Sequence, residues 1–388
     1  MSAASRLGDW ARRPAAVLPV AVAAQWLATL AVALTAERDG WRMGDTGAAA
    51  EALKAAAELV DGHLPSVGTG VVWPLVLAPI AAVAGEGVLA GLPAVVLLDT
   101  LVLAPLALVC AYWLAARAGG RLLALWTAVL WVVAPFVLLL LAQGDFGETL
   151  HNSVLPLLLG LSGEPEFAAG VALLGAAVLI AWSRSPLDAV LAGLAAGLAF
   201  GIAPRTLLFA AGALTAYALR RQTRAGALFL AALAPAVLAV AIWRIRAFDG
   251  LAPISFGTVS WSDFQGQMNG LREHFWSNRL LQWVPLAGVI AMARRSVPAA
   301  ALLAGWLGAF AVVEAASRAD LFEALLPALP AYVVLAAAIP LLVPTLPARL
   351  GALLDPVVPR SEPGPRIIAA AAILLAAAPL LLALTIPR

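Results

Sequence analysis

Residues 14–35 read PAAVLPVAVAAQWLATLAVALT, a run without one charged side chain. A helix of about 20 apolar residues is long enough to cross the hydrocarbon core of a bilayer. Arginines at positions 6, 12 and 13 precede the run, as they do in a secretory signal peptide. The run is longer than the apolar core of such a peptide, and the Ala-Glu-Arg that follows it is a poor cleavage site. We therefore predict a membrane anchor that stays in the protein.

The composition extends this prediction to the whole chain. Hydrophobic residues make up 63% of the sequence, charged residues make up 12%, and the mean hydropathy is +0.96. A soluble domain would carry about twice this fraction of charged residues. We predict an all-α, polytopic transmembrane bundle of about 11 spans. The expected spans lie at about 14–35, 91–116, 122–142, 167–182, 187–203, 206–220, 225–243, 279–293, 297–316, 321–343 and 367–386.

The apolar stretch 72–86 is short for a span and is interrupted by prolines. We interpret it as a helix half-embedded in the outer interface of the membrane. The arginines support this interpretation, because cytoplasmic loops accumulate Lys and Arg. With a cytoplasmic N-terminus, 14 of the 24 basic residues lie on the inner side. A full span at 72–86 would instead move the arginines within 117–121, 220–224 and 294–295 to the outer side.

This threading gives the outer face three long loops, at 36–72, 143–166 and 244–278, whereas the inner connections are short. We therefore expect a multi-pass protein of the cell membrane with an extracytoplasmic active face. No internal repeat of the kind that many transporters show is visible in the sequence. The predicted organisation is a transmembrane core at 1–343, a cytoplasmic linker rich in Pro and Arg at 344–366, and a C-terminal anchor at 367–388.

Carboxylates are concentrated in the first two outer loops. The first loop opens with ERDGWRMGD at residues 37–45. It continues into an Ala-rich segment that reads as a short amphipathic helix, capped near Asp45 and closed by a Gly–Pro turn. Four charged residues share one face of this helix and read as a solvated surface: Glu51, Lys54, Glu58 and Asp61. The cluster in the second loop comprises Asp145, Glu148, His151, Glu164 and Glu166.

The composition also excludes several kinds of site. The lone cysteine, Cys110, rules out a disulfide or a cysteine-based metal site within the chain. The formal net charge of +2, from scattered basic residues, gives no basis for binding nucleic acid. Glu148 and His151 are three residues apart and would share a helical face, so with Asp145 they could bind a divalent metal.

The order of segments carries a family resemblance. An apolar anchor is followed by the pair Gly44-Asp45, an Ala-rich helix, DGHLP at 61–65 and WPL at 73–75. Further segments of the pattern are LAAGLAFG at 194–201, RADLFEALLPALP at 318–330, REHFWSNRL at 272–280 and GLSGEPEF at 160–167. This order resembles the GT-C class of integral-membrane glycosyltransferases, which use polyprenyl-phosphate sugars as donors. The nearest branches are the protein O-mannosyltransferase-like and arabinofuranosyltransferase-like ones of actinobacterial type. The resemblance covers most of the chain and lies in order and topology.

The resemblance implies a general base in the first outer loop. In that class the first acidic residue of the loop activates an acceptor hydroxyl, and this role falls on Asp45. A second acid often follows directly in the family, but Thr46 stands there in this chain, so Asp39 competes for the role. A carboxylate near the water boundary can take the proton of a hydroxyl as that hydroxyl attacks the anomeric carbon.

The donor phosphate needs cations, and a guanidinium can bind two phosphate oxygens at once. The resemblance favours Arg318, followed by Arg205, with Arg279 as a further candidate. Each could instead be an arginine that extends along the interface from the end of a span. Acceptor or sugar binding is expected from Glu148, His151, His63 and Trp276. The resemblance implies no metal cofactor.

Three acids fall within or near the predicted spans. Intramembrane carboxylates are expensive to bury and suggest function. Asp188 and Glu314 lie near span ends, where we expect water to reach them, and Asp99 has no assigned role.

Together these features predict a transferase that moves a mannose- or arabinose-class sugar from a polyprenyl phosphate to a glycan or protein acceptor at the outer face. The expected partners are the polyprenyl-phosphate sugar, the acceptor and membrane lipids. The rival interpretations are a flippase or transporter of lipid-linked sugars, and an inactive GT-C-like scaffold in a cell-envelope complex.

Overall fold

The computed structural model describes residues 14–36, 47–65, 70–248, 260–275, 278–315 and 321–342. These residues are helical and form no strand; the one β-bridge among them joins Ala142 to Phe275. The α-helices are α2 (Pro14–Thr35), α4 (Ala48–Val60), α5 (Val72–Ala84), α6 (Leu92–Leu98), α7 (Ala104–Gly119), α8 (Arg121–Leu141), α9 (Phe146–Thr149), α10 (Leu155–Leu158), α11 (Pro165–Trp182), α12 (Pro186–Ile202), α13 (Phe209–Leu219), α14 (Thr223–Phe248), α15 (Trp261–His274), α16 (Asn278–Ala293), α17 (Val297–Ala315), α18 (Leu321–Leu325) and α19 (Leu329–Ala338). Short helices of other types are η1 (Gly85–Gly91), the π-helices η2 (Asp99–Leu103) and η3 (Leu150–Val154), η4 (Pro204–Leu208), η5 (Leu326–Ala328) and η6 (Ile339–Leu342).

The prediction of an all-helical membrane protein is confirmed in its general form. In the described part of the chain, 7 helical stretches are long and apolar enough to cross a membrane. These stretches are Pro14–Thr35, Val72–Gly119, Arg121–Leu141, Pro165–Trp182, Thr223–Ala247, Val297–Glu314 and Leu321–Leu342. Two shorter apolar helices also occur, at Pro186–Ile202 and Trp283–Ala293. The predicted anchor at 367–386 and the linker before it lie outside the described residues.

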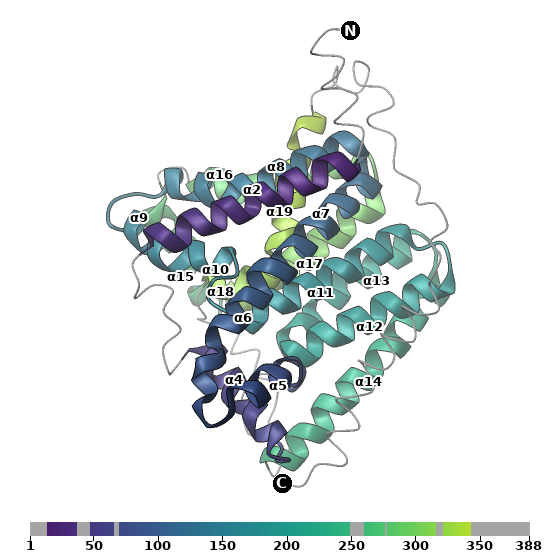
Figure 1. Ribbon diagram of the computed structural model, residues 1–388. Helices are drawn as coiled ribbons and strands as arrows, with labels where there is room; N and C mark the ends of the chain where they lie inside the picture. The colour runs from purple at the N-terminus through teal and green to yellow at the C-terminus, as the bar shows by residue number, and fades with distance from the viewer. Residues whose placement is uncertain are drawn as a thin grey trace.

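The long helices pack side by side in a continuous series (Figure 1). Helix α12 packs between α14 and α11, and α11 packs in turn against α7, which packs against α8. Helix α2 crosses α8 and α7. A second group forms where α17 packs against α13 and α16, while α16 and α8 both contact α19. Helices α4 and α5 pack against each other at one end of this bundle.

Glycines allow the closest of these contacts. A β-carbon at Gly193 in α12 would collide with the carbonyl oxygen of Phe229 in α14. Gly212 of α13 and Gly305 of α17 face each other so closely that a β-carbon at Gly305 would lie 2.6 Å from the Gly212 Cα. Small residues at such contacts let helix backbones approach, which favours association in lipid. The many Ala and Gly residues therefore allow close helix packing, in addition to making the chain hydrophobic.

The two ends of the bundle differ in charge: arginines predominate at one end, and carboxylates accompany Lys54, Arg205, Arg244 and Arg246 at the other. What we call the arginine end comprises the turns after α7, α11, α13 and α16, with Arg117, Arg121, Arg184, Arg220, Arg221, Arg224, Arg294 and Arg295. The one carboxylate described in these turns and their flanking helix ends is Asp188. What we call the carboxylate end comprises the turns and helix ends at the opposite side, with Glu51, Glu58, Asp61, Asp145, Glu148, Glu164, Glu166, Glu314 and Glu323. Eight of the 14 arginines that were predicted for the inner side therefore share one end of the bundle, and the other six lie outside the described residues.

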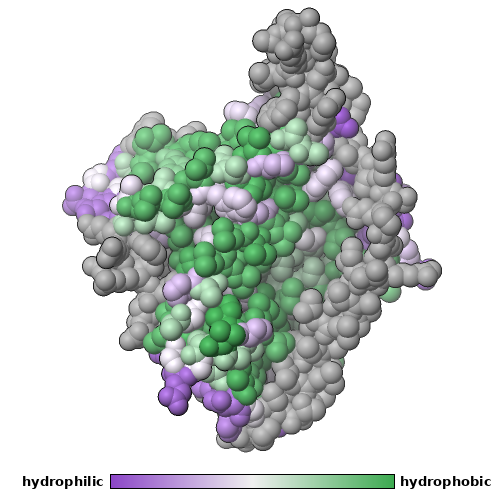
Figure 2. All heavy atoms as spheres, viewed as in Figure 1, coloured by the Kyte–Doolittle hydropathy of each residue, from purple (hydrophilic) through white to green (hydrophobic). Residues whose placement is uncertain are grey.

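On one face of the bundle, the surface between these ends is largely apolar (Figure 2). Figure 2 shows hydrophobic residues covering the face formed by α2, α6 and α7, with hydrophilic residues gathered at the edges beside α9 and α4. The exposed side chains of α2, α6 and α7 include Leu27, Leu34, Leu97 and Leu106. A soluble protein rarely exposes an apolar patch of this kind, whereas a lipid-facing surface needs one.

The predicted amphipathic helix of the first outer loop is present as α4. Glu51, Lys54, Glu58 and Asp61 are all exposed, as expected for a solvated face. The predicted cap was wrong: the helix begins after Gly47, which caps it without a side-chain hydrogen bond. The helix starts later than predicted, because the described backbone is still extended at Gly47. Helix α5 has 13 residues and follows where the half-embedded helix was expected.

Candidate functional site

The candidate site lies at the carboxylate end and is built around Glu164. Two glycines in left-handed conformation, Gly160 (φ +77°) and Gly163 (φ +69°), turn the chain from α10 into α11. A left-handed backbone costs little for glycine, which has no β-carbon. Glu164 then occupies the N-cap position of α11, and Pro165 starts the helix. The turn thereby holds a carboxyl group at the positive end of a long helix.

Glu164 has an unusual electrostatic environment. Its Oε2 atom is buried and has no hydrogen-bond partner. Burial raises the pKa of the carboxyl to about 8, and the carboxylates of Glu166, Glu323 and Glu51 raise the pKa in the same direction. Burial disfavours the charged form, and like charges nearby disfavour it further. At neutral pH the Glu164 carboxyl is therefore mostly protonated and can donate a hydrogen bond.

A buried ion pair lies beside these carboxylates. Arg205, in the short helix η4, donates from Nη1 to Oε2 of Glu314 at 2.8 Å. The Glu314 side chain is 1% exposed, whereas 44% of the Arg205 side chain remains accessible. The sequence predicted water around Glu314, and this prediction was wrong because Arg205 and the packing of α17 enclose the carboxylate. The guanidinium of Arg205 is thus partly accessible at the surface, while one of its N–H groups binds Glu314 of α17.

Glu166 connects Glu164 and the Arg205–Glu314 ion pair into one site. It lies in the first turn of α11 and is half-buried. Its carboxylate is within electrostatic reach of Glu323, Arg205 and Glu314. Three regions that are far apart in sequence, namely the start of α11, η4, and the consecutive helices α17 and α18, therefore bring charged side chains together.

Asp99 lies deeper in the protein, beneath the Glu164 turn. It opens the π-helix η2, is 0% exposed, and neither of its carboxyl oxygens has a hydrogen-bond partner. A β-carbon on Gly160 would lie 3.4 Å from the Asp99 Cβ, so the turn directly covers this residue. The backbone carbonyl of Thr100 accepts a hydrogen bond from Trp26 Nε1 of α2 at 3.1 Å. Single π-helical turns inside longer helices are frequent at functional sites.

An apolar pocket opens next to the charged residues. It has a volume of about 440 Å³ and lies between α15, α16, α17, α18 and α19. Leu321 and Phe322 in its wall directly precede Glu323, and Ala311 lies one turn before Glu314. The ring of Phe322 stacks on that of Phe146 at a centroid distance of 6.3 Å. The pocket is therefore lined by apolar residues, and its wall residues Phe322 and Ala311 lie close in sequence to Glu323 and Glu314.

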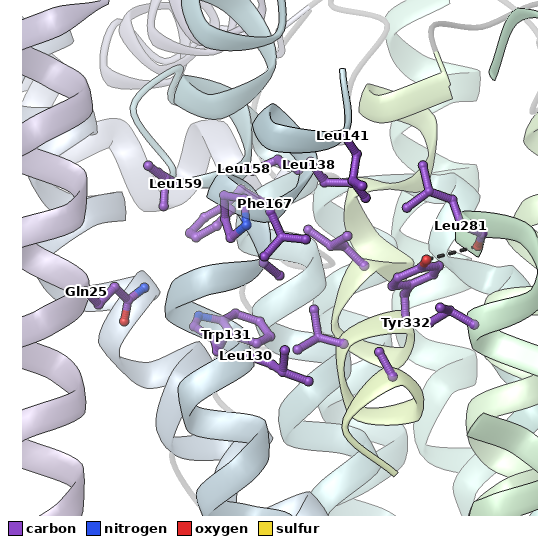
Figure 3. A pocket seen from close by; sticks show the side chains of 17 residues that line it. Gln25, Leu130, Trp131, Leu138, Leu141, Leu158, Leu159, Phe167, Leu281 and Tyr332 are labelled. Carbon is purple, nitrogen blue, oxygen red and sulfur yellow. Dashed lines mark hydrogen bonds between the residues drawn. The ribbon is translucent and has the colours of Figure 1, made fainter. Parts of the chain in front are cut away.

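A second apolar pocket of about 180 Å³ adjoins the first (Figure 3). Leu138, Leu158, Leu281, Leu329 and Tyr332 belong to the walls of both pockets. The Tyr332 hydroxyl donates a hydrogen bond to the Leu281 carbonyl at 2.9 Å, so one polar group of the shared wall is satisfied. The two pockets therefore share part of one apolar wall.

Several predicted site residues lie outside the described residues. Asp39, Asp45, Arg318 and Trp276 fall in this group. Arg279 is the second residue of α16, and its side chain also lies outside the described set. Their proposed roles remain predictions. Of the arginines named for the phosphate, Arg205 is the one that the structure describes at the charged site.

The remaining predicted residues are spread over the carboxylate end. His63 is exposed just beyond α4, and Glu148 is exposed on α9. His151 is half-buried in the π-helix η3. Within the described residues, no three His, Cys, Asp or Glu side chains come together as a possible metal site, so Asp145, Glu148 and His151 do not form one.

The sequence analysis assigned no role in the site to most of the charged residues that meet there. Glu164 and Glu166 were recognised as part of an acidic cluster, but no role was given to them. Glu323 lies inside the segment 318–330 that was quoted for the family resemblance. No role was predicted for Asp99. Two signals in the sequence could have indicated a role for these residues. The Gly-Glu-Pro-Glu order that starts a helix contains Glu164 and Glu166, and Asp99 is a carboxylate within an apolar run.

Comparisons of the chain with models of known protein families, with curated protein sequences and with solved structures give no match. The resemblance to GT-C glycosyltransferases therefore stays a prediction.

Proposed function

We propose that this protein is a membrane glycosyltransferase of GT-C type that takes a sugar from a polyprenyl-phosphate donor. The observation that carries the proposal is the meeting of Arg205, Glu164, Glu166 and Glu323 beside an apolar pocket of about 440 Å³. A polyprenyl-phosphate sugar has the matching parts: a long hydrocarbon chain, an anionic phosphate and a sugar rich in hydroxyl groups. An apolar pocket with a few convergent polar groups is the usual form of a ligand site.

The donor would bind across the boundary between pocket and charges. The polyprenyl chain would occupy the apolar lining around Leu281 and Tyr332. The phosphate would lie near Arg205, whose exposed guanidinium retains N–H donors beyond the one that binds Glu314. Arg318 and Arg279 are the further phosphate ligands that the resemblance suggests. Charge stabilisation of the leaving phosphate is the main task of these cations.

In the proposed reaction a carboxylate takes the proton of the acceptor hydroxyl as its oxygen forms a bond to the anomeric carbon. The bond from that carbon to the phosphate oxygen breaks, and the phosphate leaves with the electron pair and stays attached to the lipid. Attack from the side opposite the phosphate inverts the anomeric configuration. Asp45 is the proposed base and Asp39 its competitor. The protonated carboxyl of Glu164 would donate a hydrogen bond to the donor, because its raised pKa keeps the proton at neutral pH.

The acceptor would approach from the aqueous side of the carboxylate end. His63, Glu148, His151 and Trp276 are proposed to contact the sugar or the acceptor, which is a glycan or a protein. Mannose and arabinose are the proposed sugar classes. The proposed reaction needs no metal, because the arginines supply the positive charge that a phosphate leaving group requires.

The proposed topology has about 11 spans, with α5 half-embedded, the N-terminus in the cytoplasm and the carboxylate end outside. The separation of the arginine end from the carboxylate end supports it. A labelling experiment tests the orientation in a Cys110→Ala background. We expect a membrane-impermeant maleimide to label Asp61→Cys in intact cells but to label Arg224→Cys only after the cells are opened. The reverse pattern would contradict the proposal.

The transfer itself is tested with the purified full-length chain in lipid nanodiscs. Polyprenyl-phosphate mannose and polyprenyl-phosphate arabinose are supplied with a cell-envelope extract as acceptor, and the release of polyprenyl phosphate is measured. We expect Asp45→Asn to lower the rate by about 100-fold or more, the usual contribution of a general base. Asp61→Asn is the matched control, because Asp61 is an exposed carboxylate of the same loop, and its rate should match wild type. Full activity in both Asp45→Asn and Asp39→Asn would remove the proposed base.

A transporter of lipid-linked sugars is the second candidate, and one observation favours it. Asp99 is a fully buried, unpartnered carboxyl at a π-helical turn of an apolar stretch. Buried carboxyls in spans often belong to proton or substrate pathways. Liposomes that contain the protein discriminate the two functions: a transporter moves the labelled donor to the opposite leaflet intact, whereas a transferase releases polyprenyl phosphate.

A further inference from the structure

At the arginine end, three arginines from different elements surround the last turn of α11. Arg117, near the end of α7, donates from Nε to the carbonyl oxygen of Ala181 at 3.3 Å. Arg220, at the end of α13, donates from Nη1 to the neighbouring carbonyl oxygen of Ile180. Arg184 is exposed in the turn that follows α11. The last carbonyls of a helix lack partners within the helix, so these contacts hold the two guanidinium groups side by side.

Among the described residues of this cluster, arginines outnumber carboxylates. Arg117 lies within electrostatic reach of Arg184, and Arg220 within reach of Arg117. The nearby carboxylate, Asp188, serves the start of α12: its Oδ2 accepts the backbone N–H groups of Arg184 at 2.8 Å and Ser185 at 2.9 Å. Among the residues that the structure describes here, three arginines and one carboxylate carry formal charges that sum to about +2. Three like charges held together favour an anion between them.

Buried polar groups next to the arginines also lack partners. The Tyr217 side chain is 1% exposed, and its hydroxyl lies near Ser183 and Arg220 without a hydrogen bond of standard geometry. The indole Nε1 of Trp182 is buried and has no hydrogen-bond partner. A buried donor without a partner costs free energy, and a ligand oxygen can satisfy it. These groups point to a ligand that accepts hydrogen bonds, as a phosphate does.

We propose that Arg117, Arg184 and Arg220 form a binding site for the phosphate group of an anionic phospholipid. Guanidinium groups match phosphate oxygens in geometry and charge. Each arginine has five N–H groups, and the carbonyl contact of Arg220 uses one of them. The site is distinct from the carboxylate end and does not depend on the proposed transferase function.

Two features favour a lipid over free phosphate. Trp113 and Trp182 pack edge to face beside the cluster at 5.9 Å, and tryptophan is enriched where a protein meets the membrane interface. The side chain of Leu219, adjacent to Arg220, is 50% exposed and offers an apolar surface to an acyl chain. Basic pockets between transmembrane helices bind anionic headgroups elsewhere. A headgroup here would link α7, α11 and α13.

Native mass spectrometry of the detergent-purified full chain tests the proposal. The protein is titrated with phosphatidylglycerol and, separately, with phosphatidylcholine, whose headgroup has no net charge. We expect wild type to bind the first phosphatidylglycerol at least tenfold more tightly than phosphatidylcholine. Arg184→Gln and Arg220→Gln should each lose most of this preference. Arg224→Gln is the matched control, because Arg224 is an exposed arginine of the same end, and it should keep the preference.

Arg184→Gln should still fold, because it leaves the contacts of Arg117 and Arg220 to the α11 carbonyls in place. A loss of lipid preference in this variant therefore cannot be attributed to unfolding. Inorganic phosphate, added as a competitor, separates the two sources of a phosphate group. A bound phosphatidylglycerol that millimolar phosphate does not displace supports the lipid site. If millimolar phosphate displaces the bound phosphatidylglycerol, the site binds the free ion, and the assignment to a lipid is overturned. Equal binding of phosphatidylglycerol by wild type, Arg184→Gln and Arg220→Gln would overturn the site itself.

Discussion

The two ends of the bundle use charged residues in opposite ways. At the arginine end, Arg117 and Arg220 cap the carbonyls of α11, and Asp188 caps the start of α12. These charges satisfy the ends of helices. At the carboxylate end, the buried Oε2 atom of Glu164 has no partner, and neither carboxyl oxygen of Asp99, which lies beneath the Glu164 turn, has one.

Buried groups without a partner occur at both ends, but those at and beneath the carboxylate end are carboxyls, so we place the proposed chemistry there. Buried polar groups in stable proteins are almost always satisfied, so a cluster of unsatisfied carboxyls is a cost that the fold must carry for another reason. Like-charged carboxylates around Glu164 increase this cost. Perturbed acids beside a pocket are typical of functional sites. The following substitutions test whether the two ends differ as described.

The largest effect on stability should come from the buried ion pair. Arg205→Ala leaves Glu314, which is 1% exposed, without its arginine. Loss of one partner of a buried pair costs about 3–5 kcal/mol, and we expect about 2–3 kcal/mol because Arg205 is partly exposed. Chemical unfolding in detergent measures the free energy of unfolding. The double variant Arg205→Met/Glu314→Leu should regain much of the loss, whereas Arg224→Ala at the arginine end should change stability by less than about 0.5 kcal/mol. Equal losses for Arg205→Ala and Arg224→Ala would contradict a special role of the pair.

The next effect concerns the pH dependence of stability. The pKa of Glu164 is about 8 in the folded protein, against 4.5 for an ordinary glutamate. Between these two pH values the folded chain holds a proton that the unfolded chain has released. The contribution of Glu164 to stability is therefore complete below about pH 4.5 and is lost as the pH rises toward 8. Melting temperatures measured at pH 5 and pH 8.5 should fall more for wild type than for Glu164→Gln. An identical fall in both proteins would show that Glu164 titrates normally.

A smaller effect of opposite sign is expected at Asp99. Replacing a buried group that lacks hydrogen bonds by an apolar side chain of similar size removes an unsatisfied polar group. We therefore expect Asp99→Leu to raise the free energy of unfolding by about 1 kcal/mol. Transfer activity, measured on the same samples, should fall if Asp99 serves the site. Destabilisation by Asp99→Leu would mean that the carboxyl has a structural partner.

An effect of similar size to that of Asp99→Leu, but destabilising, should come from loss of the cap at the arginine end. Asp188→Ala removes the hydrogen bonds to the backbone N–H groups of Arg184 and Ser185. Loss of such a cap costs about 1 kcal/mol. Activity should remain at the wild-type level, because the cap lies at the opposite end of the bundle. A loss of activity without a loss of stability would contradict the separation of the two ends.

The helices and the arginine end could be predicted from the sequence. Apolar runs and arginines in short turns are local features, and each is governed by the thickness and polarity of the membrane. The capping box at Ser185 and Asp188 likewise depends on residues three positions apart. These features need no knowledge of which helices are neighbours.

The carboxylate end could be predicted only in part. The acidic loop and Arg205 were recognised, but Arg205 meets Glu314 across 109 residues of sequence. Glu314 was expected near water because it ends an apolar run, and tertiary packing buries it instead. Asp99 had no predicted role, since its environment depends on the distant turn at Gly160. Sequence patterns report local structure, whereas these contacts arise from the packing of α11, α17 and η4.

The most direct test of the central claim compares two arginines in one assay. Polyprenyl-phosphate release is measured for Arg205→Lys and Arg224→Lys in identical nanodiscs. Arg205→Lys keeps a positive charge beside Glu314, so the fold is retained, but it loses the planar guanidinium that binds two phosphate oxygens. The account predicts a fall of about tenfold or more for Arg205→Lys and none for Arg224→Lys. Equal rates for the two variants and wild type, or no release by any of them, would contradict a donor-phosphate site at the carboxylate end.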